Sequence, residues 1–180
     1  KVQDHLSDNC TLVVLSQVPP GFTRKVATSL RIKVRNHPIH VFYQAETLIF
    51  GNAVDRALNP ERHIVGCMDA QAKLPQAYMD FLESWDCPIL VMSYESAELA
   101  KIAINSYLAS SVCVTNTLAE LCESLGADWS EIRPVLQLDK RIGPHAYLQP
   151  GLGLTGGHLS RDLATLKTLS MEQGTEAGVV

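Results

Sequence analysis

The sequence predicts an α/β fold in two parts, a mainly parallel sheet followed by an all-helical region. Short apolar runs rich in β-branched residues alternate with helical patterns up to about residue 93, an order typical of a parallel sheet covered by helices. From Glu95 to about Leu125 the chain contains neither proline nor glycine, and apolar residues recur at steps of three and four. With 46% hydrophobic residues, the 180-residue chain can bury a substantial core.

The sheet region is expected to contain four buried strands, because each apolar run is short and bounded by turn residues. These strands are predicted at residues 11–15, 39–43, 63–67 and 88–92. A helix is expected from Thr23 to Val34, after the Pro19-Pro20-Gly21 break. A second helical pattern runs from about Gln71 to Trp85.

The helical region begins after Ser93, which divides the chain into predicted domains at 1–93 and 94–180. A single helix of about 45 Å is expected from Glu95 to Leu125, at 1.5 Å per residue, with Gly126 as its terminator. A shorter helix is predicted at 130–138, capped by Ser130 or Asp128. The last helix is expected to start at Asp162.

Composition excludes several classes of protein. A net charge of −4 without a basic stripe argues against a nucleic-acid partner, and no apolar run is long enough to span a bilayer. Five widely spaced cysteines form no C-x-x-C pair, so neither a metal site nor a disulfide framework is indicated. Free thiols favour a reducing, cytoplasmic location. The start at Lys1, without methionine, is typical of a segment of a longer chain.

Two segments carry the functional signal. One is the glycine-dense stretch Q-P-G-L-G-L-T-G-G-H-L-S-R-D at 149–162, and the other is E-S-A-E-L-A-K-I-A-I-N at 95–105. Glycine carries no Cβ, so such a loop lets the backbone approach a ligand closely. Together the segments resemble the active-site signatures of the UDP-glucose/GDP-mannose dehydrogenase family, whose loop reads P-G-x-G-[YF]-G-G-S-C-[FL]-P-K-D. The resemblance implies the end of a Rossmann-like NAD-binding domain, followed by a helical dimerisation domain.

Lys101 and Asn105 are four residues apart, so on a helix they share one face. A solvated polar face would explain them, but their neighbours are apolar and asparagine has poor propensity in mid-helix. The resemblance assigns both to the active site, where they hold water and stabilise oxyanionic intermediates.

Glu46 and Gln17 follow predicted strands. The segment around Glu46 resembles the family pattern N-P-E-F-L-R-E-G, whose glutamate serves as a base or holds a water, although a simple loop charge is the alternative. The flanking residues Ala45, Thr47 and Phe50 depart from that pattern. Gln17 lies in S-Q-V-P-P-G, where the family has a threonine that positions a water on the cofactor side. The resemblance places both residues beside NAD.

The substrate would be held around the glycine-dense loop. Two segments, D-K-R-I-G at 139–143 and Y-L-Q-P-G at 147–151, resemble family segments that surround the sugar and its diphosphate. The resemblance implies that the substrate contacts Arg141, Tyr147, Gly151, Gly153 and Gly156. A surface ion pair is an equal alternative for Arg141. Asp162 matches the signature's catalytic aspartate, while the N-cap of the last helix is the alternative.

His158 stands where the family has its nucleophilic cysteine. A thiolate adds to the aldehyde intermediate and later leaves readily, whereas imidazole is a poorer nucleophile that can shuttle protons. Three interpretations remain: an enzyme that performs only the first oxidation or uses His158 as a base, a protein that binds without turnover, or a histidine that merely lines a loop.

The chain contains no G-x-G-x-x-G turn, so NAD would be bound by the full-length parent. The predicted function is that of a segment of a nucleotide-sugar 6-dehydrogenase, and the alternative is a nucleotide-sugar-binding or dimer-scaffold protein. A third interpretation is a helical association module. The resemblance also implies a homodimer formed through the long helix, although that helix could equally be buried within one subunit.

Overall fold

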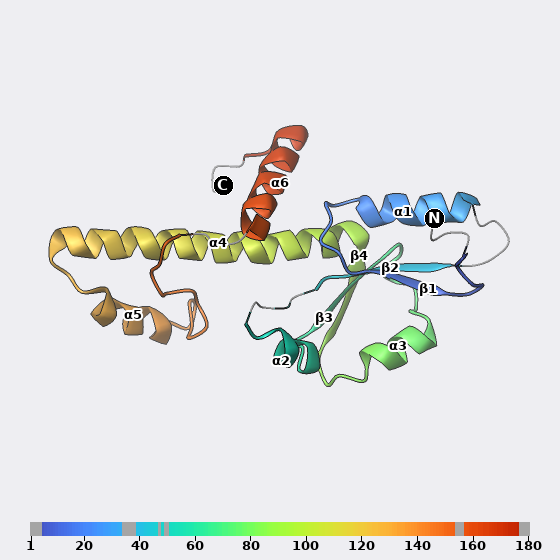
Figure 1. Ribbon diagram of the computed structural model, residues 1–180, viewed down its shortest axis with the longest axis horizontal. Helices are drawn as coiled ribbons and strands as arrows, with labels where there is room; N and C mark the ends of the chain where they lie inside the picture. The colour runs from blue at the N-terminus through green and yellow to red at the C-terminus, as the bar shows by residue number, and fades with distance from the viewer. Residues whose placement is uncertain (1–4, 34–38, 47, 49–50, 154–156, 177–180) are drawn as a thin grey trace. The chain divides into compact units, whose positions relative to one another are not determined.

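The computed structural model describes residues 5–33, 39–46, 48, 51–153 and 157–176, with the backbone alone at 31–33 and 158. The chain forms two compact units, Lys1–Lys101 and Ile102–Val180. The first unit contains the sheet and the second contains helices (Figure 1). The boundary falls inside the longest helix.

The first unit contains a four-stranded sheet in the order β1-β2-β3-β4. Its strands confirm the four predicted ones to within one residue at either end: β1 (Thr11–Val14), β2 (His40–Gln44), β3 (His63–Cys67) and β4 (Ile89–Ser93). β1 pairs with β2 and β3 with β4 in parallel. β2 and β3 are antiparallel, and the described residues between them include the short α2 (Ala53–Leu58).

Helices α1 (Phe22–Lys33) and α3 (Gln76–Leu82) lie on opposite sides of this sheet (Figure 1). The core on the α3 side is apolar and almost fully buried, and consists of Phe42, Val65, Cys67, Tyr78 and Leu82. Burying one such large side chain contributes about 1.5–3 kcal/mol. This core holds the strands whose ends carry candidate site residues.

Helix α3 is shorter than predicted. It starts after Pro75, which occupies its N-cap, and ends at Leu82 instead of Trp85. A residue that precedes proline is disfavoured in the helical region, so Leu74 cannot extend the helix backwards. The apolar periodicity therefore continues through residues that are not helical.

The long helix is α4 (Tyr94–Leu125), as the sequence predicts. Ser93 caps its start by accepting the Ser96 N–H at 3.2 Å. After its end Gly126 has a φ of +70°, which confirms the predicted glycine terminator. No described helix combines the length and the apolar character that crossing a membrane requires.

Two further helices complete the second unit. α5 (Trp129–Leu138) is capped by Asp128, which accepts the Ser130 N–H at 2.7 Å and so decides between the two predicted caps. α6 (Gly157–Gln173) starts five residues before the predicted Asp162. The polar run that precedes Asp162 is therefore helical.

Candidate functional site

Gln17 and Glu46 lie beyond the carboxyl ends of two neighbouring parallel strands. β1 and β2 pair in register from Thr11 with His40 to Val14 with Tyr43, so the segments that follow them emerge at one sheet edge. This is the edge at which α/β proteins bind ligands. Gln17 is half-buried, whereas Glu46 is exposed and its carboxylate accepts the backbone N–H of Leu48.

Lys101 is half-buried in the second turn of α4. Within the described part of the chain, its ammonium has no hydrogen bond or ion pair. Asn105 follows one turn later and is 7% exposed. The expected alignment of the two residues on α4 is therefore present.

Asn105 and Asp162 form the most buried polar pair of the second unit. The Asn105 Nδ2 donates to Asp162 Oδ2 at 2.5 Å, and Asp162 is 2% exposed. Asp162 is the sixth residue of α6, so the N-cap interpretation is wrong. A buried carboxylate costs free energy unless donors satisfy it, and the amide from α4 supplies one. The structure thus joins two candidate site residues that are 57 positions apart.

The segment before the glycine-dense loop is held against α4 and α5. Three helix side chains each make one hydrogen bond to its backbone: Thr115 Oγ1 donates to Tyr147 O (2.7 Å), Trp129 Nε1 donates to Leu148 O (3.0 Å), and Asn116 Oδ1 accepts from Gly151 N (2.9 Å). The carbonyl of Tyr147 and the N–H of Gly151 are thus occupied. Both residues are otherwise exposed.

Arg141 is exposed, and its guanidinium donates two hydrogen bonds to the carboxylate of Asp139. Nε donates to Oδ1 at 2.9 Å, and one terminal nitrogen donates to Oδ2 at 2.6 Å. Hydrogen bonds from Arg141 lower the pKa of the Asp139 carboxyl, and the same contact raises the pKa of Arg141. The surface ion pair expected as an alternative is therefore present.

The loop itself is described only in part. Gly153 has a φ of +96°, a conformation that favours glycine, whereas Gly151 has no such requirement. Gly156 lies outside the described residues. The backbone of His158 belongs to the first turn of α6, and its side chain lies outside the described part.

The first unit also holds a cavity of about 340 Å³ at the opposite sheet edge. It is lined by the start of β2 and the end of β3, with polar groups from His40, Asp69 and Lys73. None of the predicted site residues lines this cavity. It therefore does not belong to the candidate site.

Comparison with known proteins shows which family the segments that carry these residues resemble. Residues 95–180 match the model of the UDP-glucose/GDP-mannose dehydrogenase family, central domain. Over 171 residues the chain is 33% identical to a UDP-glucose 6-dehydrogenase of Rickettsia typhi, covering 94% of this chain and 38% of that protein. These matches relate the chain to the UDP-glucose/GDP-mannose dehydrogenase family.

Solved structures of this family share the fold. A UDP-glucose dehydrogenase from Pyrobaculum islandicum superposes with a TM-score of 0.84 at 32% identity, covering 94% of this chain and 39% of the other. A UDP-D-ManNAc dehydrogenase from Pyrococcus horikoshii has a TM-score of 0.77 at 20% identity, with 93% and 40% covered. The chain thus spans about two fifths of the length of the relatives that it matches.

Two residues that hold the 147–151 segment, Thr115 and Asn116, are not among the predicted site residues. Thr115 is 2% exposed and donates to the carbonyl of Tyr147, and the side-chain oxygen of Asn116 accepts from the N–H of Gly151. Asn116 stands in the middle of α4, where asparagine has poor propensity. The same signal singled out Asn105, so it could have identified Asn116.

Proposed function

We propose that the full-length protein oxidises the C6 hydroxyl of a UDP- or GDP-linked sugar with NAD, and that this chain contributes the catalytic side chains. One observation carries the proposal: the buried hydrogen bond between Asn105 and Asp162, with Lys101 one turn earlier in the same helix, α4. Such fixed polar groups in a dry site stabilise developing charge more strongly than water does. Relatives of the chain are named UDP-glucose 6-dehydrogenases, which agrees with this reaction.

Each side chain has a chemical task in this proposal. Lys101 stabilises the alkoxide that forms as the C6 hydroxyl loses its proton, because an ammonium beside a developing anion lowers its energy. Asn105 and Asp162 hold a water or the hydroxyl itself, and Glu46 serves as a base or orients a water. Tyr147 and the glycine-dense loop, with Gly151, Gly153 and Gly156, enclose the sugar and diphosphate, and Arg141 contacts the diphosphate.

NAD would accept the hydride. Within this chain its neighbours are Gln17 and Glu46, which emerge at the ligand-binding edge of the sheet. The N-terminus of α1 is not open to a pyrophosphate, because the Glu98 carboxylate already accepts its backbone N–H groups. The groups that hold the pyrophosphate therefore lie elsewhere in the full-length protein.

His158 limits the second half of the reaction. Oxidation of the alcohol to the aldehyde removes two electrons and needs no covalent nucleophile. Completion to the acid needs an added water or thiol, and imidazole can supply only a proton acceptor for that water. We therefore propose that turnover stops at the aldehyde or continues through the hydrated aldehyde with His158 as base. The histidine equally favours a second candidate, a protein that binds nucleotide sugars without oxidising them.

The deciding experiment counts NADH formed per sugar consumed by the full-length protein, over a panel of UDP- and GDP-sugars. One NADH indicates arrest at the aldehyde, and two indicate that water attacks without a thiol. Asp162→Asn is expected to lower the rate at least about 100-fold, as removal of a transition-state contact does. Asp86→Asn, the same change at an exposed aspartate, leaves it unchanged. Absence of NADH with every sugar, together with measurable binding, would favour the second candidate.

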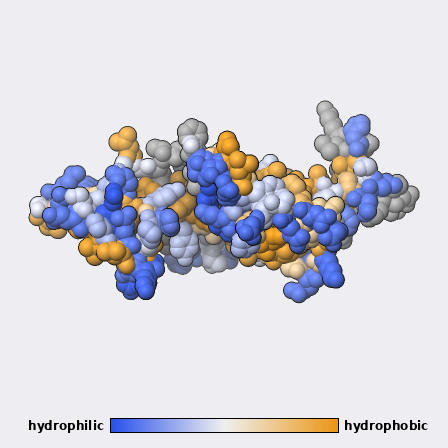
Figure 2. All heavy atoms as spheres, turned by 90° about the horizontal axis from the view of Figure 1, so that it is seen from below, coloured by the Kyte–Doolittle hydropathy of each residue, from blue (hydrophilic) through white to orange (hydrophobic). Residues whose placement is uncertain are grey.

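We also propose that the protein is a homodimer joined through α4. Six large apolar side chains on this helix are between 38% and 80% exposed, and all but Leu99 follow one line: Tyr107, Val114, Leu118, Leu121 and Leu125. Their spacing of seven, four, three and four residues places them within about 40° of one line at 100° per residue, like the seam of a coiled coil. Figure 2 shows patches of apolar side chains among hydrophilic ones on the face that it draws. A continuous apolar stripe favours burial against a second helix.

A further inference from the structure

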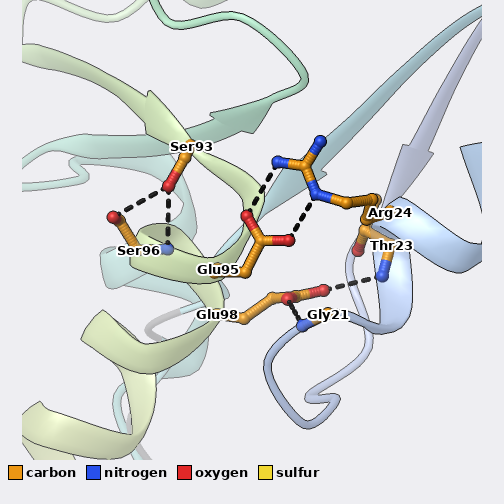
Figure 3. A network of polar contacts seen from close by, with 7 residues as sticks. All are labelled: Gly21, Thr23, Arg24, Ser93, Glu95, Ser96 and Glu98. Carbon is orange, nitrogen blue, oxygen red and sulfur yellow. Dashed lines mark hydrogen bonds and ion pairs between the residues drawn. The ribbon is translucent and has the colours of Figure 1, made fainter.

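Glu98 is a buried carboxylate that the proposed chemistry does not use. It lies on α4 with 0% exposure. Its Oε2 accepts the N–H of Gly21 at 2.6 Å, and its Oε1 accepts the N–H of Thr23 at 2.8 Å (Figure 3). Both carboxylate oxygens are therefore engaged at the start of α1.

Helix α1 needs this contact because its own sequence provides no cap. The first turn contains no acidic residue, and Gly21, with a φ of +88°, has no side chain to offer. The N–H groups of a first turn have no partner inside their helix, and the dipole makes that end positive. A carboxylate from 75–77 positions along the chain satisfies both needs.

A second contact joins the same two helices nearby. Arg24 donates from Nε to one oxygen of Glu95 at 2.5 Å and from a terminal nitrogen to the other at 2.8 Å (Figure 3). These side chains are 41% and 40% exposed, so solvent screens their attraction. The buried Glu98 contact is accordingly the stronger constraint between the start of α4 and the start of α1.

The constraint acts on two residues of the candidate site. Gln17 lies in the loop that connects β1 to the capped end of α1. Lys101 lies three residues after Glu98, within one turn of the same helix. We propose that Glu98 is a positioning residue, which holds the Lys101 turn of α4 in a fixed place relative to the Gln17 loop. Its effect on turnover rests on the function proposed above.

Kinetics of the full-length protein test this role. Glu98→Gln keeps the side-chain volume but presents an NH₂ group to one of the two N–H donors, so the helix turn shifts. A displacement of about 1 Å can cost up to about 100-fold in rate, and we expect kcat to fall at least tenfold with KM unchanged. Glu98→Asp retains the charge and recovers part of the rate. Glu95→Gln, which breaks the exposed pair between the same helices, stays within twofold of the parent.

A second readout does not depend on turnover. Lysines dimethylated with ¹³C-formaldehyde report their surroundings by NMR, and Lys101→Arg assigns the Lys101 signal. We expect this signal to move in Glu98→Gln and to stay in place in Glu95→Gln. If Glu98→Gln does not fold, Glu98→Asp takes its place in both assays, with a smaller effect in the same direction.

The two assays separate the outcomes. A parent that oxidises no nucleotide sugar contradicts the proposed function alone, and the NMR signal then decides the positioning role. An unmoved Lys101 signal in a folded Glu98 variant overturns that role. The positioning role is also overturned if the kcat of Glu98→Gln stays within twofold of the parent, or if that variant changes KM alone.

Discussion

At the scale of single residues, the buried hydrogen bond between Asn105 and Asp162 defines the candidate site. The amide of Asn105 donates an N–H to Asp162 without adding a charge to this buried position. A second carboxylate at this distance could not ionise together with the first. The chemistry of the pair therefore depends on the identity of residue 105.

Asn105→Asp is expected to make stability fall as pH rises. The two carboxyl groups of the folded variant would retain a shared proton to higher pH than the unfolded chain does, so the pKa of the pair is raised. The contribution of this pair to stability is therefore present below about pH 4 and lost toward pH 7. Urea unfolding at pH 4.5 and 7.5 measures this slope. Asn105→Leu, which removes the donor without adding a charge, should show a smaller slope. Equal slopes would contradict the assignment of the contact.

His63 is a second buried residue with a pH-dependent role. Gln44 Nε2 lies 3.3 Å from its Nδ1, and the Tyr78 hydroxyl donates to Gln44 Oε1 at 3.0 Å. Its Nε2 is buried and has no hydrogen-bond partner in the described part of the chain. Burial lowers the pKa of His63, so the neutral ring is the folded form.

His63→Phe is expected to reduce the loss of stability in mild acid. In the parent the folded pKa lies below the unfolded value of about 6.5. The contribution of His63 to stability is therefore complete above that value, and it is lost as the pH falls from there toward the folded pKa. The variant keeps an aromatic ring against Trp85, 5.3 Å away, without a titrating group. The free energies of unfolding at pH 7.5 and pH 5.0 give the dependence of stability on pH for each protein. His145→Gln, at an exposed histidine, is the control and should keep the pH dependence of the parent.

At the scale of elements, the packing of β3 against the first turns of α4 leaves no room at Gly66. A Cβ there would lie 2.9 Å from the Cβ of Ala97 and 3.2 Å from the Cα of Tyr94. The second of these atoms is backbone and cannot rotate away. The glycine is thus what allows the strand and helix to approach.

Gly66→Ala is expected to destabilise the protein by about 1–3 kcal/mol, the usual range for overpacking. The shift of the urea midpoint at constant m-value measures this. Gly157→Ala provides the control, because a Cβ there meets nothing within 4 Å and alanine favours a helix. A neutral Gly66→Ala would show that β3 and α4 can separate without cost.

At the scale of the whole molecule, the proposed dimer can be tested on α4. Leu121→Lys places a charge on the apolar stripe, while Glu123→Lys places the same residue about 200° around the helix. We expect the first to shift sedimentation toward the monomer and the second to leave the dimer intact. If Leu121→Lys has no effect, the stripe is covered within one subunit.

The sequence by itself determined the local elements. The four strands and the long helix follow from apolar periodicity and from the placement of glycine and proline, which act on neighbouring residues. The antiparallel pairing of β2 and β3, the pairing of Asn105 with Asp162 and the capping of α1 by Glu98 join residues far apart in the chain. Only the tertiary structure decided these, because a buried polar group is satisfied by whichever partner the fold brings within about 3 Å.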